Sequence, residues 1–170
     1  MKIVCIGDFH IPERASDIPV WIGKIIMKEK PDLILCTGDL TSKMPIQFLS
    51  LVAHVKCVKG NMDSVDLPKS EIIEAYGKKI CVVHGTEVHP RGDIGQLLRI
   101  AESMDADVLV HGHTHKLDVR KHEGILFVNP GSATGVWGGS SEGGQETFAI
   151  MEIDKKGKIK IRKFKDGKEF

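Results

Sequence analysis

Aspartate, asparagine and histidine recur where short apolar runs of this 170-residue chain end. The residues concerned are Asp8, His10, Asp39, Asn61, His84, His113 and His115. Carboxylate, amide and imidazole groups without a thiolate form a nitrogen and oxygen set that suits Mn, Fe, Co, Ni or Zn better than Ca. Such a set is too large for one tetrahedral ion but suits two ions that share a carboxylate. The residue types therefore predict a site for two divalent metal ions.

The spacing of these residues supports the same hypothesis. Asp8 with His10, and His113 with His115, are i, i+2 pairs, and in extended backbone both members of such a pair point the same way. A lone His84 after a strand would more often be a hydrogen-bonded histidine than a ligand. The prediction therefore rests on all the segments together rather than on any one of them.

Hydrophobic periodicity predicts the elements that must position these residues. Short buried strands that end shortly before the candidate ligands are expected over residues 2–7, 33–36, 56–59, 79–83 and 108–110. Helices with one apolar face are expected over residues 17–30, 45–54 and 92–104. Strands that alternate with helices indicate parallel pairing, and the carboxyl ends of neighbouring parallel strands meet at one edge of a sheet. We therefore expect the ligands to converge.

The rest of the chain changes to a pattern of strands and turns. A hairpin is expected where residues 71–76 and 79–83 flank Gly77, and further strands are expected over residues 117–120, 125–128, 147–153 and 158–164. Mixed pairing of this kind predicts an α/β fold with two packed sheets and helices outside. We expect one domain over residues 1–170, with a surface loop over residues 138–144.

Composition narrows the classes of function. The net charge is +1, hydrophobic residues make up 41% and charged residues 28%, as in a folded globular protein. The apolar runs are too short for a membrane span or a signal peptide, so we expect a cytoplasmic protein without membrane contact. Residues 155–168 are basic but lack interleaved aromatic residues, so they read as the charged face of a strand and give no strong nucleic-acid signal. Widely spaced cysteines are expected to be buried thiols.

The motifs Gly-Asp-x-His, Gly-Asp, Gly-Asn-x-Asp, His-Gly and Gly-His-x-His follow one another in this order along residues 1–137. This order resembles the calcineurin-like metallophosphoesterase superfamily. Within the superfamily, the chain resembles the small prokaryotic phosphodiesterase subfamily and, over residues 7–12, 35–38 and 129–135, the metallophosphoesterase-like scaffold subunit of retromer. The resemblance implies a four-layer α/β/β/α sandwich with two mixed β-sheets.

The resemblance also implies roles for the site residues. One ion would be bound by Asp8, His10, Asp39 and His115, and the other by Asp39, Asn61, His84 and His113. His111 is left as a neighbour of the site. Asp39, Asn61 and His84 would act with a hydroxide that bridges the two cations. Manganese is the first expectation, with nickel, iron, cobalt or zinc as alternatives.

The resemblance leaves several functions open. The favoured one is a metal-dependent phosphodiesterase whose partner is a phosphodiester substrate. The alternative is a protein-interaction scaffold of the retromer-subunit type with little or no catalysis. A nuclease of the same superfamily is less favoured, because no basic face with stacking aromatics is expected. The sequence also leaves open a homo-oligomer or a protein partner, for which Trp137, Met44 and Ile46 are candidate exposed apolar contacts.

One position departs from the pattern of the superfamily. Many members have a histidine after the asparagine of Gly-Asn-x-Asp, whereas this chain has Met62. Methionine cannot protonate a leaving oxygen, so Met62 predicts a weaker enzyme or one that favours good leaving groups. Asp63 loses its usual partner and is expected only to orient local backbone. Arg91 and His89 are candidates for contact with a substrate phosphate, or else are solvated loop residues.

Overall fold

A computed structural model describes residues 1–138 and 144–170 of the chain. The surface loop expected over residues 138–144 therefore falls mostly outside the described residues. No helix within the described part of the chain combines the length and the apolar character that a membrane span requires.

The first sheet has six strands in the order β11-β10-β9-β1-β2-β3. Its strands are β1 (Lys2–Ile6), β2 (Leu33–Cys36), β3 (Val55–Cys57), β9 (Thr147–Ile153), β10 (Ile159–Lys165) and β11 (Lys168–Glu169). Strands β1, β2 and β3 are parallel to one another, whereas β9 runs antiparallel to β1. The sheet is therefore mixed, as the sequence predicts.

The second sheet has five strands in the order β4-β5-β6-β8-β7. Its strands are β4 (Ser70–Ala75), β5 (Lys78–Val83), β6 (Val108–Val110), β7 (Leu117–His122) and β8 (Ile125–Pro130). Strands β5, β6 and β8 are parallel, and the antiparallel strands β4 and β7 form the two edges. The β4–β5 hairpin turns at Tyr76 and Gly77, which have φ angles of 49° and 73°.

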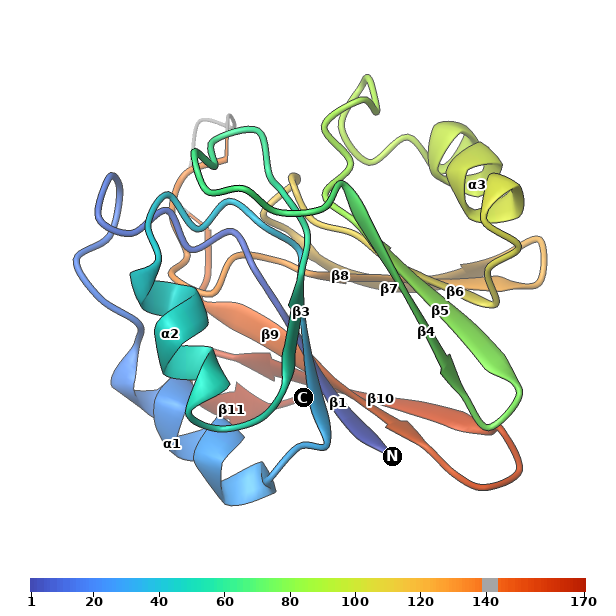
Figure 1. Cartoon of the computed structure of the whole chain (residues 1–170), viewed down its shortest axis with the longest axis horizontal. Coiled ribbons are helices and arrows are strands. Elements are labelled where there is room, and N and C mark those ends of the chain that lie inside the picture. Colours follow the sequence, from blue (N-terminus) through green and yellow to red (C-terminus); the bar gives the residue numbers. More distant parts are fainter. Residues whose placement is uncertain (139–143) are drawn as a thin grey trace.

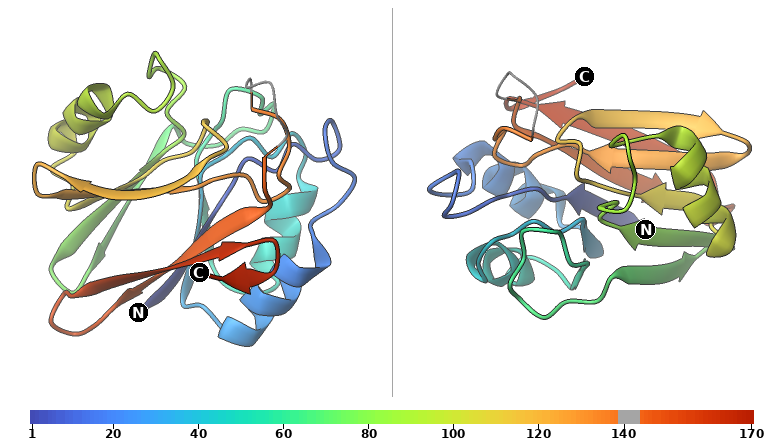
Figure 2. Two further views of the ribbon diagram at one scale, coloured as in Figure 1. Left: turned by 180° about the vertical axis from the view of Figure 1, so that it is seen from behind. Right: turned by 90° about the horizontal axis from the view of Figure 1, so that it is seen from above.

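The helices lie outside the two sheets (Figures 1 and 2). Helices α1 (Val20–Glu29) and α2 (Met44–Ser50) cover the first sheet, and α3 (Ile94–Ser103) covers the second. Three clusters of buried residues correspond to the three interfaces between these layers. One joins α1 and α2 to the first sheet, one joins the sheets, and one joins the second sheet to α3. The four-layer α/β/β/α sandwich is therefore confirmed.

Helix boundaries differ from those expected. α1 begins at Val20, three residues after the expected start, because the ψ angle of Pro19, at 128°, lies outside the helical range. α2 ends at Ser50 rather than at residue 54. Met44 and Ile46, which were expected to be exposed, are half-buried and pack against the core between the helices and the first sheet.

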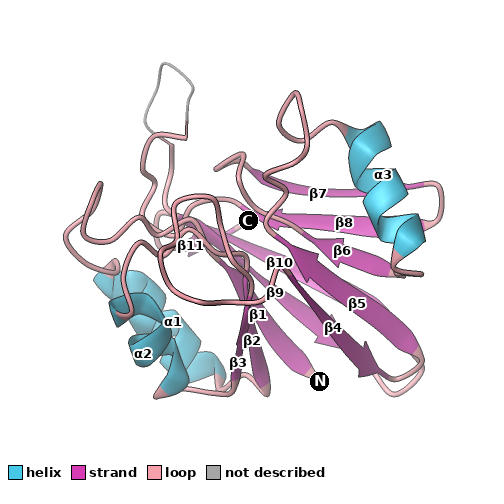
Figure 3. Cartoon of the chain, turned by 45° about the horizontal axis from the view of Figure 1, so that its top comes forward, coloured by secondary structure: helices cyan, strands magenta, loops and turns pink. Residues whose placement is uncertain are grey.

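The structure also bears on the expected state of the cysteines and on the expected convergence of the strand ends. All four cysteines are buried and free, which confirms the prediction of buried thiols. The loops that follow β1, β2, β3, β5 and β6 gather at one end of the sandwich (Figure 3). This is the end at which the carboxyl ends of the parallel strands meet.

Candidate metal centre

Two groups of buried side chains meet at the carboxyl ends of the parallel strands, and they share Asp39. The first group contains Asp8, His10, Asp39 and His115, and the second contains Asp39, His84 and His113. Within each group, every residue offers a nitrogen or oxygen atom, and these atoms lie within 4.8 Å of one another. Residues from both sheets are thus brought together at one point.

The backbone of the i, i+2 pairs is not extended, so the condition under which both members of a pair would point the same way is not met. Asp8 and His10 have φ angles of 50° and 48°, and His113 and His115 have φ angles of 69° and 57°. Non-glycine residues seldom adopt positive φ, and such conformations cluster at functional sites. The members of each pair are therefore aimed by tight turns after the strands rather than by strand geometry.

In the first group, the four side chains approach one another closely. His10 Nε2 lies 3.2 Å from His115 Nε2 and 3.4 Å from an Asp39 oxygen, and His115 Nε2 lies 3.4 Å from Asp8 Oδ1. His115 Nδ1 lies 2.9 Å from the carbonyl oxygen of Val136. Because a carbonyl only accepts, Nδ1 is the donor, and Nε2 faces the centre of the group.

In the second group, His84 is oriented in the same way. Its Nδ1 donates to the Thr37 carbonyl at 2.7 Å. Its Nε2 lies 3.1 Å from Asn61 Oδ1, 3.1 Å from His113 Nδ1 and 3.4 Å from an Asp39 oxygen. The structure therefore places Asn61 beside the second group, as expected from its position after β3.

The donor set fits divalent cations. Around His84 Nε2, the amide oxygen of Asn61 and the carboxylate of Asp39 can only accept a hydrogen bond. Asp8 Oδ1 is buried and has no hydrogen-bond donor among the described residues. Buried acceptors that face one another without donors are unfavourable unless a positive charge lies between them. A metal ion in each group would supply this charge, because neutral imidazoles and carboxylates are suitable ligands for divalent cations.

The pKa values of the site residues also reflect how closely these groups lie. Burial alone would raise the pKa of Asp39, but its hydrogen bond to His84 and the charge of His84 lower the pKa to about 2. Burial alone would lower the pKa of His84, yet the hydrogen bond to Asp39 and the charges of Asp8 and Asp39 raise that pKa to about 9. Burial lowers the pKa values of His10 and His113 to about 4. A protonated His84 therefore places a positive charge beside Asp39, in the position that a metal ion would occupy.

Asp63 holds the loop that carries Asp39. One carboxylate oxygen accepts from the backbone N–H groups of Asp39 and Gly60 at 2.8 and 2.9 Å. The other accepts from Leu40 and Thr41 at 2.7 and 3.0 Å. Asp63 itself is 7% exposed. The prediction that Asp63 orients local backbone is thus confirmed. The side chain of Asp63 also joins the loops that follow β2 and β3.

Glycine is required where the backbone passes close to these carboxylates. A methyl group added to Gly60 would lie 2.1 Å from Asp39 Oδ1, and one added to Gly112 would lie 2.7 Å from Asp8 Oδ2. Any side chain at either position would displace a candidate ligand. The Met62 backbone N–H also donates to Asp39 Oδ1 at 2.8 Å, while its side chain is 39% exposed.

Several supporting groups were not found from the sequence. The carbonyl groups of Thr37 and Val136 orient histidines, but every residue has a carbonyl, so the sequence carries no signal for them. Ser132 Oγ donates to the Asp8 carbonyl at 2.7 Å, and Thr134 Oγ1 donates to the Phe9 carbonyl at 2.8 Å. These hydroxyl groups fix the β1 loop from the segment that follows β8.

His111 lies outside both groups. It is buried, and its Nδ1 lies 3.2 Å from the amide nitrogen of Asn129. Burial lowers the pKa of His111 to about 4, so the ring is neutral. Its place as a neighbour rather than a member of the cluster agrees with the expectation.

Arg91 lies beside the second group, and His89 lies in the loop that lines the cavity beside His84. Arg91 is exposed, and its guanidinium lies 3.5 Å from the His113 carbonyl and contacts the Gly138 carbonyl. The backbone N–H of His89 donates to the Gln96 side chain at 3.2 Å. A phosphate contact by Arg91 or His89 stays a prediction.

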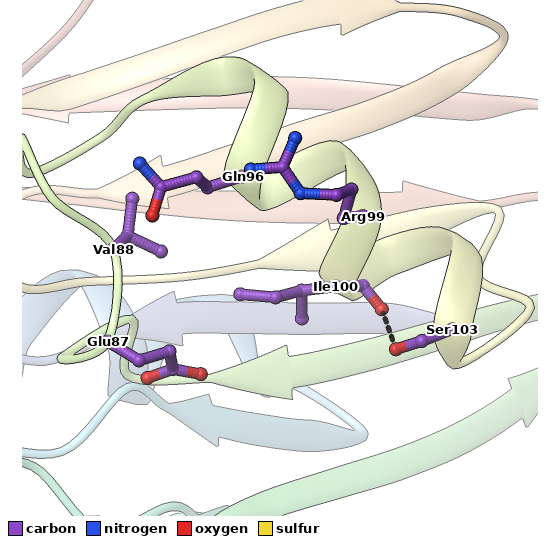
Figure 4. Close-up of a pocket in the computed structure, with 6 residues that line it drawn as sticks. All are labelled: Glu87, Val88, Gln96, Arg99, Ile100 and Ser103. Atoms are coloured by element: carbon purple, nitrogen blue, oxygen red, sulfur yellow. Dashed lines mark hydrogen bonds between the residues drawn. The ribbon is translucent and has the colours of Figure 1, made fainter.

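A cavity of about 710 Å³ opens beside His84 and is also lined by Lys59, Lys69, Glu87 and His89, among others. This volume lies in the range of small-molecule sites. A separate depression of about 270 Å³ lies between α3 and the preceding loop. Its lining residues, drawn in Figure 4, are Glu87, Val88, Gln96, Arg99, Ile100 and Ser103. None of the cluster residues lines it, so it lies outside the candidate centre.

Comparison with known proteins agrees with this geometry. The calcineurin-like phosphoesterase superfamily domain matches residues 1–156. The chain belongs to this superfamily. A probable metallophosphoesterase from Methanothermobacter thermautotrophicus is 42% identical over 137 residues, which cover 79% of this chain and 78% of that protein. Family membership supports a hydrolase that acts on phosphoesters.

Solved structures of Vps29 superpose closely on this chain. Wild-type Vps29 from Entamoeba histolytica complexed with zinc has a TM-score of 0.92 and 34% identity, covering 100% of this chain and 96% of that chain. Vacuolar protein sorting 29 from Cryptosporidium parvum has a TM-score of 0.90 and 30% identity, covering 99% and 94%. The resemblance to both phosphoesterases and Vps29 proteins is therefore confirmed.

Proposed function

We propose that this chain, folded as one domain over residues 1–170, is a metal-dependent phosphodiesterase with two divalent cations. The observation that carries the proposal is that Asp39 is common to two buried groups of metal-binding atoms. Bound cations would supply a nucleophilic hydroxide by lowering the pKa of water towards ~7, and would neutralise charge on the phosphoryl oxygens.

The first ion would be held by Asp8, His10, Asp39 and His115. The Val136 carbonyl, which accepts from His115 Nδ1 at 2.9 Å, would keep the Nε2 lone pair of that ring directed at the ion.

The second ion would be held by Asp39, Asn61, His84 and His113. The Thr37 carbonyl would orient His84 in the same way, and Asp39 would contact both ions. The donor set is compatible with manganese, which we propose first, and with nickel, iron, cobalt or zinc. Zinc is the metal in one of the Vps29 structures.

The substrate would enter from the cavity beside His84. Lys59 and Lys69 line this cavity and would attract an anionic ester. Met62 follows Asn61 in the loop that reaches the second group, and its thioether has no proton to give. An ester with a good leaving group would not need that proton. We therefore propose a preference for activated phosphodiesters.

Hydrolysis of bis(4-nitrophenyl) phosphate and 4-nitrophenyl phosphate by purified apo-protein, with added Mn, Ni, Zn, Co or Fe, tests the proposal. Diester turnover should appear with at least one metal and fall by at least about 100-fold in Asp39→Ala, because loss of supporting groups alone typically costs 10–100-fold. Asp66→Ala, an exposed carboxylate in the β3–β4 connection, is the matched control. Equal turnover by both variants would remove Asp39 from the mechanism.

A second candidate is a protein-interaction scaffold. The observation that favours it is the similarity to Vps29 over the whole chain, at 34% identity. A scaffold would not require a functional metal centre. Absence of turnover with every metal, together with tight binding of a folded protein partner, would favour this candidate.

A further inference from the structure

Trp137 is an exposed aromatic side chain at the rim of the candidate metal centre, with 52% of its surface accessible. The residues on both sides of it contact His115. The Val136 carbonyl accepts from His115 Nδ1 at 2.9 Å, and a methyl group added to Gly138 would lie 2.5 Å from His115 Cγ. The backbone of Trp137 is therefore fixed against a proposed metal ligand.

Arg14 reaches the same indole ring from the loop after β1. Its Cζ lies 5.5 Å from the Trp137 ring centroid, and its Nη1 donates to the Trp137 carbonyl at 2.7 Å. The backbone N–H of Arg14 donates to the His10 carbonyl at 2.8 Å, which anchors this residue to another proposed ligand. Arg14 and Trp137 thus form one unit beside the His10 and His115 half of the centre.

We propose that Trp137 and Arg14 are a stacking platform for the aromatic base of a small nucleotide-type phosphodiester. The inference rests on the proposed function, since it names the substrate class of the same site. An aromatic ring stacks on any base, and an adjacent guanidinium strengthens the contact. The guanidinium keeps further N–H donors that match a phosphate oxygen. A base on Trp137 would place the attached phosphate towards His10 and His115.

A small ligand fits better than a polymer. Within residues 1–138 and 144–170, the other exposed tryptophan, tyrosine or phenylalanine rings are Tyr76 and Phe170. Tyr76 lies in the β4–β5 turn, at the opposite end of β5 from His84, and Phe170 lies 4.9 Å from the Lys163 ammonium. Among the described residues, successive bases of a nucleic-acid strand would therefore find Trp137 as the single exposed tryptophan, tyrosine or phenylalanine ring at the centre.

The two tryptophans of the chain allow a direct binding test. Trp21 is half-buried and its indole N–H donates to Glu146, so Trp21→Phe leaves Trp137 as the reporter of fluorescence. Adenosine 5′-monophosphate should quench this fluorescence and bind about tenfold more tightly than ribose 5-phosphate, with Zn²⁺ present. Equal affinity for the two compounds would overturn the proposal.

Calorimetry of position 137 variants completes the test. Trp137→Leu should lose the preference for adenosine 5′-monophosphate, whereas Trp137→Phe and Trp21→Phe should largely retain it. A Trp137→Leu protein that is folded by circular dichroism and still prefers the nucleotide would refute the platform. So would loss of a dimer in Trp137→Leu without any change in nucleotide preference, because the ring would then belong to a protein interface.

Nucleotide binding and ester turnover are measured in separate experiments, so the two proposals can fail separately. A chain that hydrolyses no ester with any metal, yet loses nucleotide preference in Trp137→Leu, retains the platform and loses the catalytic proposal. A chain that hydrolyses diesters, but whose nucleotide preference does not depend on Trp137, retains catalysis and loses the platform.

Discussion

Replacement of Asp63 by alanine should destabilise the protein strongly, because this carboxylate accepts hydrogen bonds from four backbone N–H groups. Three of the donors belong to buried residues, Asp39, Leu40 and Gly60, whereas Thr41 is half-buried and can reach water. A buried donor left without a partner costs about 1–3 kcal/mol. With partial relaxation of the loop, we expect Asp63→Ala to lower the free energy of unfolding by about 3–5 kcal/mol.

Asp63→Asn should give an intermediate loss. Its single carbonyl oxygen can accept from one pair of N–H groups, while its NH₂ group faces the other pair. Urea unfolding followed by circular dichroism measures both variants in the absence of metal. Asp66→Ala is the control, because Asp66 is exposed in the same connection and should change stability by less than about 0.5 kcal/mol. If Asp63→Ala were no less stable than Asp66→Ala, the inferred role of Asp63 would be wrong.

Three further predictions concern the metal centre. Gly60→Ala should weaken metal affinity by at least about tenfold in calorimetry, because its methyl group would meet Asp39 Oδ1 at 2.1 Å. Gly95→Ala on α3 is the control and should leave the metal affinity unchanged, because the atom nearest to its methyl group would be 3.5 Å away. The pKa of His84 is raised to about 9, so metal must displace its proton, and affinity should rise by about tenfold per pH unit up to pH 9. Calorimetry at pH 7.5 in buffers of different ionisation enthalpy should detect the released proton, and its absence would refute the assignment. Met62→His should raise turnover of monoesters relative to activated diesters, and an unchanged ratio would contradict the leaving-group argument.

Much of the fold followed from the sequence because the strands that carry the candidate ligands are short, apolar and bounded by glycine. Strand β6 and strand β9 have the bounds expected from the hydrophobic pattern. β11 was missed, because two exposed residues, Lys168 and Glu169, carry no hydrophobic period. Helix α2 was placed too long, because its apolar pattern continues beyond Ser50 into a turn.

The candidate site was predictable in its side chains but not in its supports. The residue types at the strand ends identified the cluster around Asp39, and the structure brings those residues together. The four hydrogen bonds that Asp63 accepts, and the carbonyl groups that accept from His84 and His115, come together only when distant loops meet. Positive φ angles at Asp8 and His10 likewise come from tertiary packing, and the i, i+2 spacing alone could not predict them.

The most direct test is a crystal structure of the manganese-soaked protein with anomalous diffraction measured at the manganese edge. The proposed centre predicts two anomalous peaks per chain. One should be bound by Asp8, His10, Asp39 and His115, and the other by Asp39, Asn61, His84 and His113. A single peak, or two peaks without Asp39 in common, would contradict the shared centre on which the proposed chemistry depends.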